Sequence, residues 1–284
     1  MAWFKRKPKD PPPIERPSLC VLLTDLPKFE PKALAAKLAA IEPLRLYPKL
    51  KFDVAEKDVL HGHAEFDSHV VRIAGFHAPL PESVMAMTID TSAWQGEVRE
   101  EMKSHKAHLL LFHEGGGKDV PERMIALYKL AAVLGGESLL GVVHEGGWTC
   151  APKGIVRDFL DANELVMMRE GLPPVIFWGF MPFRGEEETW YATKGGHVFG
   201  VPDLVVRGSG EGNSEMMALF HNIFLYMVRV KRIEHGHTMQ LGDELFLKFE
   251  TLPPDHPHHD YLSGKDKTLL IKRITKDQVT LGNP

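Results

Sequence analysis

The spacing of hydrophobic and polar positions predicts the first elements of the fold. Residues 18–24 form a leucine-rich and β-branched run, which is typical of a buried strand. Residues 31–41 repeat apolar side chains at helical spacing and begin with a proline, which the first turn of a helix tolerates. The runs 61–66 and 69–76 predict two strands joined by a tight turn at Asp67-Ser68.

Two successive strand-loop-helix units follow. A strand at 108–113 precedes a glycine loop and a helix over 120–134, and a strand at 138–143 precedes a second glycine pair and a helix from Pro152 to about Ala162. Each strand ends in the sequence His-Glu-Gly-Gly, and the two copies lie 31 residues apart, at positions 113 and 144. If the two strands are parallel, both corners lie at the same edge of the sheet.

The second half of the chain is richer in strand patterns and contains the longest amphipathic helix. That helix is predicted over 214–230, with Met216, Phe220, Ile223 and Met227 on one face. Strands are predicted at 174–183, 189–193, 203–207, 245–249 and 269–274. The whole pattern predicts an α+β fold of two layers, with helices packed on a largely antiparallel mixed sheet.

Three regions are predicted along the chain. Residues 1–17 contain five prolines and a net charge of +3, which predicts a flexible tail; the alternative is a membrane anchor that inserts Trp3 and Phe4. Residues 18–163 form an N-terminal α+β half that carries the duplicated unit. Residues 164–284 form a C-terminal α+β half.

Composition and charge narrow the class of protein. The 284 residues include 38 acidic and 34 basic ones, so the net charge of −4 gives no basic field that would favour nucleic acid. Cys20 and Cys150 are too few and too far apart for a disulfide scaffold or a four-thiolate zinc site, which favours the cytoplasm. The apolar runs are too short to cross a bilayer, so no integral membrane segment is expected.

Several phrases of the sequence resemble a known bacterial family. They are His105-Lys-Ala-His-Leu-Leu-Leu, the glycine loop before the 120–134 helix, and Thr193-Lys-Gly-Gly-His-Val-Phe-Gly-Val-Pro-Asp-Leu-Val-Val206. Together they make residues 18–250 similar to domain-of-unknown-function family 4261. The resemblance implies a bacterial source, and it implies no particular activity, cofactor or catalytic residue.

The duplicated corners supply the catalytic candidates. His113, Glu114, His144 and Glu145 combine imidazoles with carboxylates, which is the chemistry of acid–base pairs. Neighbouring residues on a strand point to opposite faces, so the hypothesis pairs His113 with Glu145, or His144 with Glu114. The alternative is that these residues are only strand ends that turn into glycine loops.

Anion and metal sites receive weaker support. The loop Glu114-Gly-Gly-Gly-Lys118 before a helix would suit a phosphate, but it lacks the spacing of a Walker loop. His256, His258 and His259 are weak candidate metal ligands, because such a cluster in a polar loop is more often an exposed turn that binds metals only adventitiously. No cofactor is predicted.

The segment that carries the family resemblance supplies the binding candidates: Lys194, His197, Phe199 and Asp203. Glycines specify a backbone path there, and apolar side chains stand where a loop would ordinarily be polar. They predict a recognition surface, and the alternative is that Phe199 is a core residue beneath the 214–230 helix. Methionines and aromatic residues of the second half, among them Met181 and Phe183, are interpreted as core, or alternatively as a groove for a partner.

The prediction for function is a non-enzymatic binding or interaction module whose partner is another protein, with an immunity or stress-related role as one version. The alternative is a small hydrolase or metal-dependent enzyme built on the His-Glu-Gly-Gly corners. The absence of an identifiable nucleophile or complete ligand set favours the first.

Overall fold

The computed structural model describes residues 16–56, 59–117, 119–184, 188–243, 245–256, 258–262 and 267–279. Almost the whole predicted tail, residues 1–15, and Lys118 of the glycine loop lie outside these ranges. No helix within them combines the length and the apolar composition needed to cross a bilayer.

Seven strands of the described chain form the first sheet, in the order β2-β3-β4-β5-β1-β6-β7, with every neighbouring pair antiparallel. The strands are β1 (Ser18–Leu23), β2 (Lys49–Glu56), β3 (Val59–Phe66), β4 (His69–Phe76), β5 (Ala107–Gly115), β6 (Leu139–His144) and β7 (Thr149–Pro152). The predicted hairpin is confirmed as β3 and β4, with Asp67 at φ 51° in its turn. β1 lies in the middle of the sheet, and both of its faces are covered. Its side chains are accordingly apolar on both faces.

Helices cover both faces of this sheet. On one face, α4 (Val120–Gly135) packs against β1, β5 and β6, together with α1 (Pro31–Ile41), α5 (Lys153–Asp158) and α6 (Ala162–Gly171). On the other face, a separate apolar cluster around Cys20, Leu22 and Met102 includes side chains of α2 (Glu82–Thr88) and α3 (Gly96–Lys103). α4 is buried on nearly all sides, so its sequence is apolar around most of its circumference.

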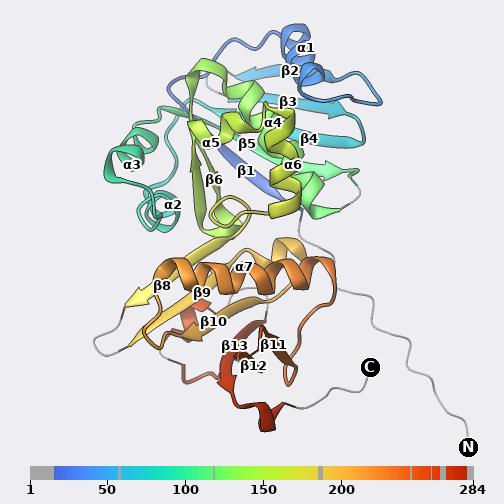
Figure 1. The fold of residues 1–284 in the computed structure, drawn as a ribbon. Coiled ribbons are helices and arrows are strands. Elements are labelled where there is room, and N and C mark those ends of the chain that lie inside the picture. Colours follow the sequence, from blue (N-terminus) through green and yellow to red (C-terminus); the bar gives the residue numbers. More distant parts are fainter. Residues whose placement is uncertain are drawn as a thin grey trace, which may run out of the picture.

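The second sheet contains six described strands in the order β11-β12-β13-β10-β9-β8. They are β8 (Gly179–Arg184), β9 (Thr189–Lys194), β10 (Asp203–Arg207), β11 (Thr238–Leu241), β12 (Leu245–Thr251) and β13 (Thr268–Ile274). β10 and β13 are parallel, and the other pairs are antiparallel. The long helix α7 (Asn213–Arg229) lies across the face of this sheet that is turned toward the first sheet, and a short helix, α8 (His259–Leu262), precedes β13 (Figure 1).

The α+β class and the largely antiparallel pairing are therefore confirmed, whereas the predicted two-layer packing of helices on one sheet is not. The chain builds two sheets, and one apolar core continues from α4 to the aromatic residues beneath α7. Two contacts join the units closely. Tyr128 Oη on α4 donates to the carbonyl of Ile176, at 2.8 Å, and a Cβ added to Gly179 would lie 2.1 Å from the carbonyl oxygen of Gly147.

The predicted division between residues 163 and 164 lies within the helix α6. α6 packs against α4, so it belongs with the first sheet, and the chain passes to the second sheet only after Gly171. The helix predicted from Pro152 to about Ala162 is shorter in the structure, where α5 ends at Asp158. The strand predicted from 174 begins at Gly179, after a turn in which Val175 has φ 62°.

Candidate functional site

The two His-Glu-Gly-Gly corners lie at the same edge of the first sheet but are not neighbours. β5 and β6 are both antiparallel to β1, so they run in the same direction, as the offset of the repeat predicts. β1 lies between them, however, with Ser18 opposite Phe112 and Cys20 opposite Val143. A whole strand therefore separates the corners.

The same register decides which side chains share a face. Residues directly opposite each other in a sheet point to the same side, so Phe112 and Val143 lie on one face of the sheet with Ser18 and Cys20. His113 and His144 each follow these residues by one position and point to the opposite face, toward α4. The hypothesis that His113 pairs with Glu145, or His144 with Glu114, therefore fails. Each of these pairs would join a histidine on one face of the sheet to a glutamate on the other face.

His113 has a different partner. Its Nε2 lies 3.1 Å from Nδ1 of His69, both rings are buried, and burial lowers the pKa of His113 to about 4. In such a pair one ring donates an N–H to the unprotonated nitrogen of the other, and both rings stay uncharged at neutral pH. Glu114 instead forms a salt bridge with Arg72 on the outer face, with Oε1 3.0 Å from Nε.

His144 is buried beside the first contact between the two sheets. Its Nδ1 is buried without a hydrogen-bond partner among the described residues, and burial lowers its pKa to about 4, with a further contribution from His197. Glu145 points to the other face, into a cavity that Cys20 and His108 also line. Burial strongly raises the pKa of the Cys20 thiol, which therefore stays protonated and is a poor nucleophile.

The glycine loop before α4 has a structural explanation. Gly116 has φ +77°, and a Cβ there would lie 1.3 Å from the carbonyl oxygen of Ser68, so only glycine fits. The side chain of Asp119 accepts a hydrogen bond from the N–H of Glu122, so the start of α4 carries its own carboxylate cap. That carboxylate occupies the place where a phosphate would bind.

The candidate metal ligands do not converge among the described residues. No group of three histidine, cysteine, aspartate or glutamate side chains in that part of the chain is arranged to hold a metal ion. His256 packs edge-on against Trp190, with ring centroids 4.5 Å apart. His258 stacks on Phe183 at 5.1 Å, and His259 approaches Asp260 at 3.7 Å. Their contacts are those of a packed turn.

The segment predicted to bind a partner lies at the junction of the two sheets and is largely buried. It runs from the end of β9 through a 3-10 turn (Gly196–Phe199) into β10. The carboxylate of Asp203 accepts a hydrogen bond from the N–H of Gly196 at 2.9 Å, which fixes the turn. Burial raises the pKa of Asp203 and lowers that of Lys194, while the attraction between their charges opposes both changes.

The side chains of this segment face inward. Phe199 is 8% exposed and packs edge-on against Phe177 and Phe224, the latter on α7. Phe199 is therefore placed as its interpretation as a core residue expects, and its role in recognition stays a prediction. His197 adjoins Gly146 of the second corner, where a Cβ on that glycine would lie 3.4 Å from its Nε2.

Lys194 connects the buried segment to an open surface. Its Nζ donates to the carbonyl of Leu262 at 3.2 Å and lies over the ring of Trp148, 4.8 Å from the centroid. Trp148 follows the second corner, has the left-handed φ of 49°, and is partly exposed. The second glycine pair of the repeat therefore positions this tryptophan at the junction of the two sheets.

A groove of about 770 Å³, here called the junction groove, opens beside Trp148. It is lined by Ser83, Ala86, Met87 and Thr91 from the α2 region, by Trp148, by Met181, Pro182 and Phe183 of β8, and by His258, Asp260 and Tyr261. Tyr261 stands edge-on to Trp148 at 5.7 Å and to Phe183 at 6.0 Å. Four segments far apart in the sequence contribute to the groove, so no local spacing predicts it; only the methionine and aromatic composition around Met181 and Phe183 points to it.

The chain was also compared with known proteins. No family model, curated protein or solved structure matched it, so its membership of family 4261 stays a prediction.

Proposed function

We propose that the protein is a non-enzymatic binding module that holds a partner protein in the junction groove. The observation that carries this proposal is the aromatic wall formed by Trp148, Phe183 and Tyr261, of which Tyr261 is 63% exposed. A group of adjoining apolar side chains at a groove marks a binding site more often than single exposed residues do, and aromatic residues and methionine are enriched at protein interfaces.

The lining of the groove suggests what the partner presents. Its described walls are apolar and aromatic, with flexible Met87 and Met181 that adapt to different shapes. Among the described residues that line the groove, Asp260 is the one acidic residue, and its side chain is fully exposed. A surface loop that inserts a large apolar side chain and places a lysine or arginine next to it would satisfy both features.

The buried cluster behind the groove supports the same role. Lys194 lies over the ring of Trp148, and its Nζ is held by a hydrogen bond to the carbonyl of Leu262. An aromatic side chain that is positioned before binding loses less conformational entropy when a partner docks. The hydrolase alternative gains no comparable support, because the His and Glu side chains of the corners lie on opposite faces of the sheet.

Replacing Tyr261 with alanine is expected to weaken partner binding at least tenfold, because the groove loses its most exposed aromatic wall. A displayed library of random peptides is selected on the wild-type chain, and the affinities of the enriched peptides are measured by calorimetry. We expect peptides in which an aromatic or large aliphatic residue adjoins lysine or arginine.

The matched control is Tyr47→Ala, which removes a tyrosine of nearly equal exposure, 65%, outside the groove. It is expected to bind the selected peptides like the wild type. Equal affinities for the Tyr261→Ala and Tyr47→Ala variants, or a library that yields no binding peptide, would refute the proposal.

A further inference from the structure

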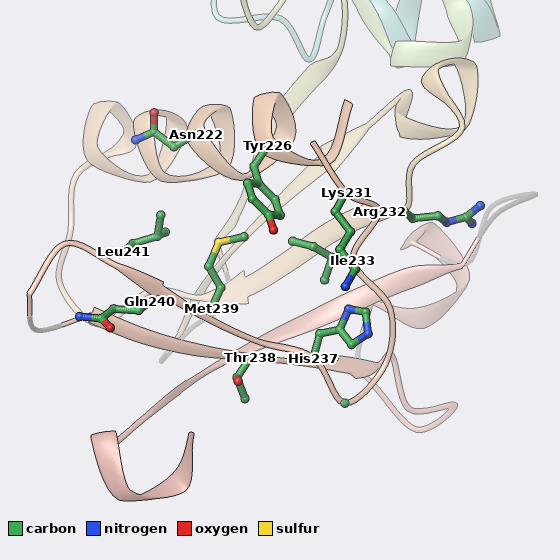
Figure 2. Close-up of a pocket in the computed structure, with 11 residues that line it drawn as sticks. Asn222, Tyr226, Lys231, Arg232, Ile233, His237, Thr238, Met239, Gln240 and Leu241 are labelled. Carbon is green, nitrogen blue, oxygen red and sulfur yellow. The ribbon is translucent and has the colours of Figure 1, made fainter. Parts of the chain in front are cut away.

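A second groove, here called the edge groove, lies between α7 and β11, and its cavity volume is about 580 Å³. Figure 2 shows Tyr226 of α7 pointing down into it toward Met239 and Ile233, while Lys231 extends toward His237 at one end. The helix and the strand thus form two long walls, with an apolar floor and cationic side chains at one end.

β11 is an edge strand, so half of its backbone polar groups face away from the sheet. Gly236, at φ +85°, donates to the carbonyl of Phe249, and the Phe249 N–H donates to the carbonyl of His237, which is the pattern of a bulge with glycine in its first position. His237 therefore turns its polar groups toward β12, and by the two-residue period so do Met239 and Leu241. The N–H and the carbonyl of Gln240 point outward.

The side chains of these residues alternate between the two faces of the sheet. Met239 and Leu241 pack against the core beneath α7, whereas Gln240 is exposed and points away from the groove (Figure 2). An extended peptide laid beside β11 would pair its backbone with Gln240 and place every second side chain over the apolar floor. An exposed edge with an apolar groove beside it is the usual setting for this mode of binding.

The charge of the groove indicates which end group such a peptide carries. Lys231 and Arg232 are exposed, form no ion pair with any residue in the described ranges, and line the groove with His237. None of the groove's described lining residues is acidic. His237 Nδ1 accepts a hydrogen bond from the N–H of Glu234, so only its Nε2 is directed elsewhere.

We propose that the edge groove binds an extended peptide segment of a partner protein by strand addition to β11, with a carboxylate of that segment held by Lys231, which Figure 2 shows extending toward His237. The site is separate from the junction groove, and it shares no lining residue with it. The carboxylate belongs either to the carboxyl terminus of the partner or to an acidic side chain within the segment.

The proposal is tested with the full chain and a synthetic array of hexapeptides rich in β-branched and aromatic residues. Each peptide is prepared with a free carboxyl terminus and as its amide, and peptides with an internal glutamate are paired with their glutamine versions. We expect a subset to bind and to lose at least tenfold in affinity when the carboxylate is removed. Amidation identifies a terminal carboxylate, and the glutamine version identifies a side-chain carboxylate.

Two variants test the two parts of the site. Gln240→Pro removes the outward N–H at an edge position that tolerates proline, and it is expected to abolish binding while Gln240→Ala retains it. The variant Lys231→Glu is expected to lower affinity at least tenfold for peptides that carry the recognised carboxylate, and to leave their amide or glutamine versions unaffected.

Hydrogen exchange supplies a measurement that needs no variant. A bound peptide is expected to slow exchange of the Gln240 amide at least tenfold, because that N–H enters a new ladder of hydrogen bonds. Binding that leaves Gln240 exchange unchanged, binding that survives Gln240→Pro, or an array without any bound peptide overturns the proposal. The Tyr261→Ala variant binds these peptides like the wild type, so failure here is distinct from failure of the junction groove.

Discussion

Lowering the pH from 7 to 5 is expected to remove about 4 kcal/mol from the free energy of unfolding, because two buried histidines resist protonation. Burial lowers the pKa of His113 and of His144 to about 4 each, from an ordinary value of 6.5. In the unfolded chain both imidazoles bind protons as the pH falls below 6.5, whereas the folded chain keeps them neutral. Stability is therefore complete above pH 6.5 and decreases as the pH falls toward 4.

The variant His144→Gln is expected to reduce the loss of stability between pH 7 and pH 5 by about 2 kcal/mol, which is the contribution of His144. The measurement is urea unfolding at half-unit pH intervals, and it compares slopes with pH, so a constant loss of stability in the variant does not affect it. His63→Gln is the matched control, since the His63 side chain is exposed on β3. A slope that is the same in all three proteins would show that burial of His144 does not cause the acid sensitivity.

Replacing Phe199 with serine is expected to lower the free energy of unfolding by about 3 kcal/mol or more, which is the usual effect of removing a large side chain from a core. The ring is 8% exposed and packs between Phe177 and the α7 residue Phe224, so its loss leaves a cavity where the two sheets meet. Urea unfolding with a single transition measures the change.

Tyr47→Ser serves as the reference for this variant, because its ring is 65% exposed, and it is expected to change stability by less than about 0.5 kcal/mol. If Phe199→Ser proved as stable as Tyr47→Ser, the ring would not be a structural residue of the junction. That result would favour the role of Phe199 in recognition that the sequence predicts.

Elements with a strong local signal could be predicted from the sequence. The apolar run of β1, the turn between β3 and β4, and the apolar stripe of α7 lie where their patterns indicate. The sequence pattern does not predict β2 or α6, for two different reasons. β2 mixes charged residues into a strand at the edge of the sheet, and α6 buries only Leu165 and Met168, so its helical period is faint.

The candidate site was less predictable because its residues come together only through the tertiary fold. The repeat correctly placed His113 and His144 at one edge of the sheet, but it could not show that β1 separates them. The equal spacing of the two copies also rules out pairing of the histidine of one corner with the glutamate of the other. Equivalent residues lie on the same face of the sheet, so the two histidines lie on one face and the two glutamates on the other. The junction groove depends on Trp148 meeting Tyr261 from the far end of the chain, and no sequence period connects those two positions.

The central place of β1 in the first sheet affects how the chain folds during synthesis. β1 is translated early, yet one of its edges waits for β5, which ends at residue 115, and the other waits for β6, which ends at residue 144. Until residue 144 has left the ribosome, a nascent chain therefore carries an apolar strand with at least one unpaired edge, which is a hazard for aggregation. The same delay recurs when β10 waits for β13. Ribosomes that stall before His144 would therefore release fragments that chaperones and proteases must handle.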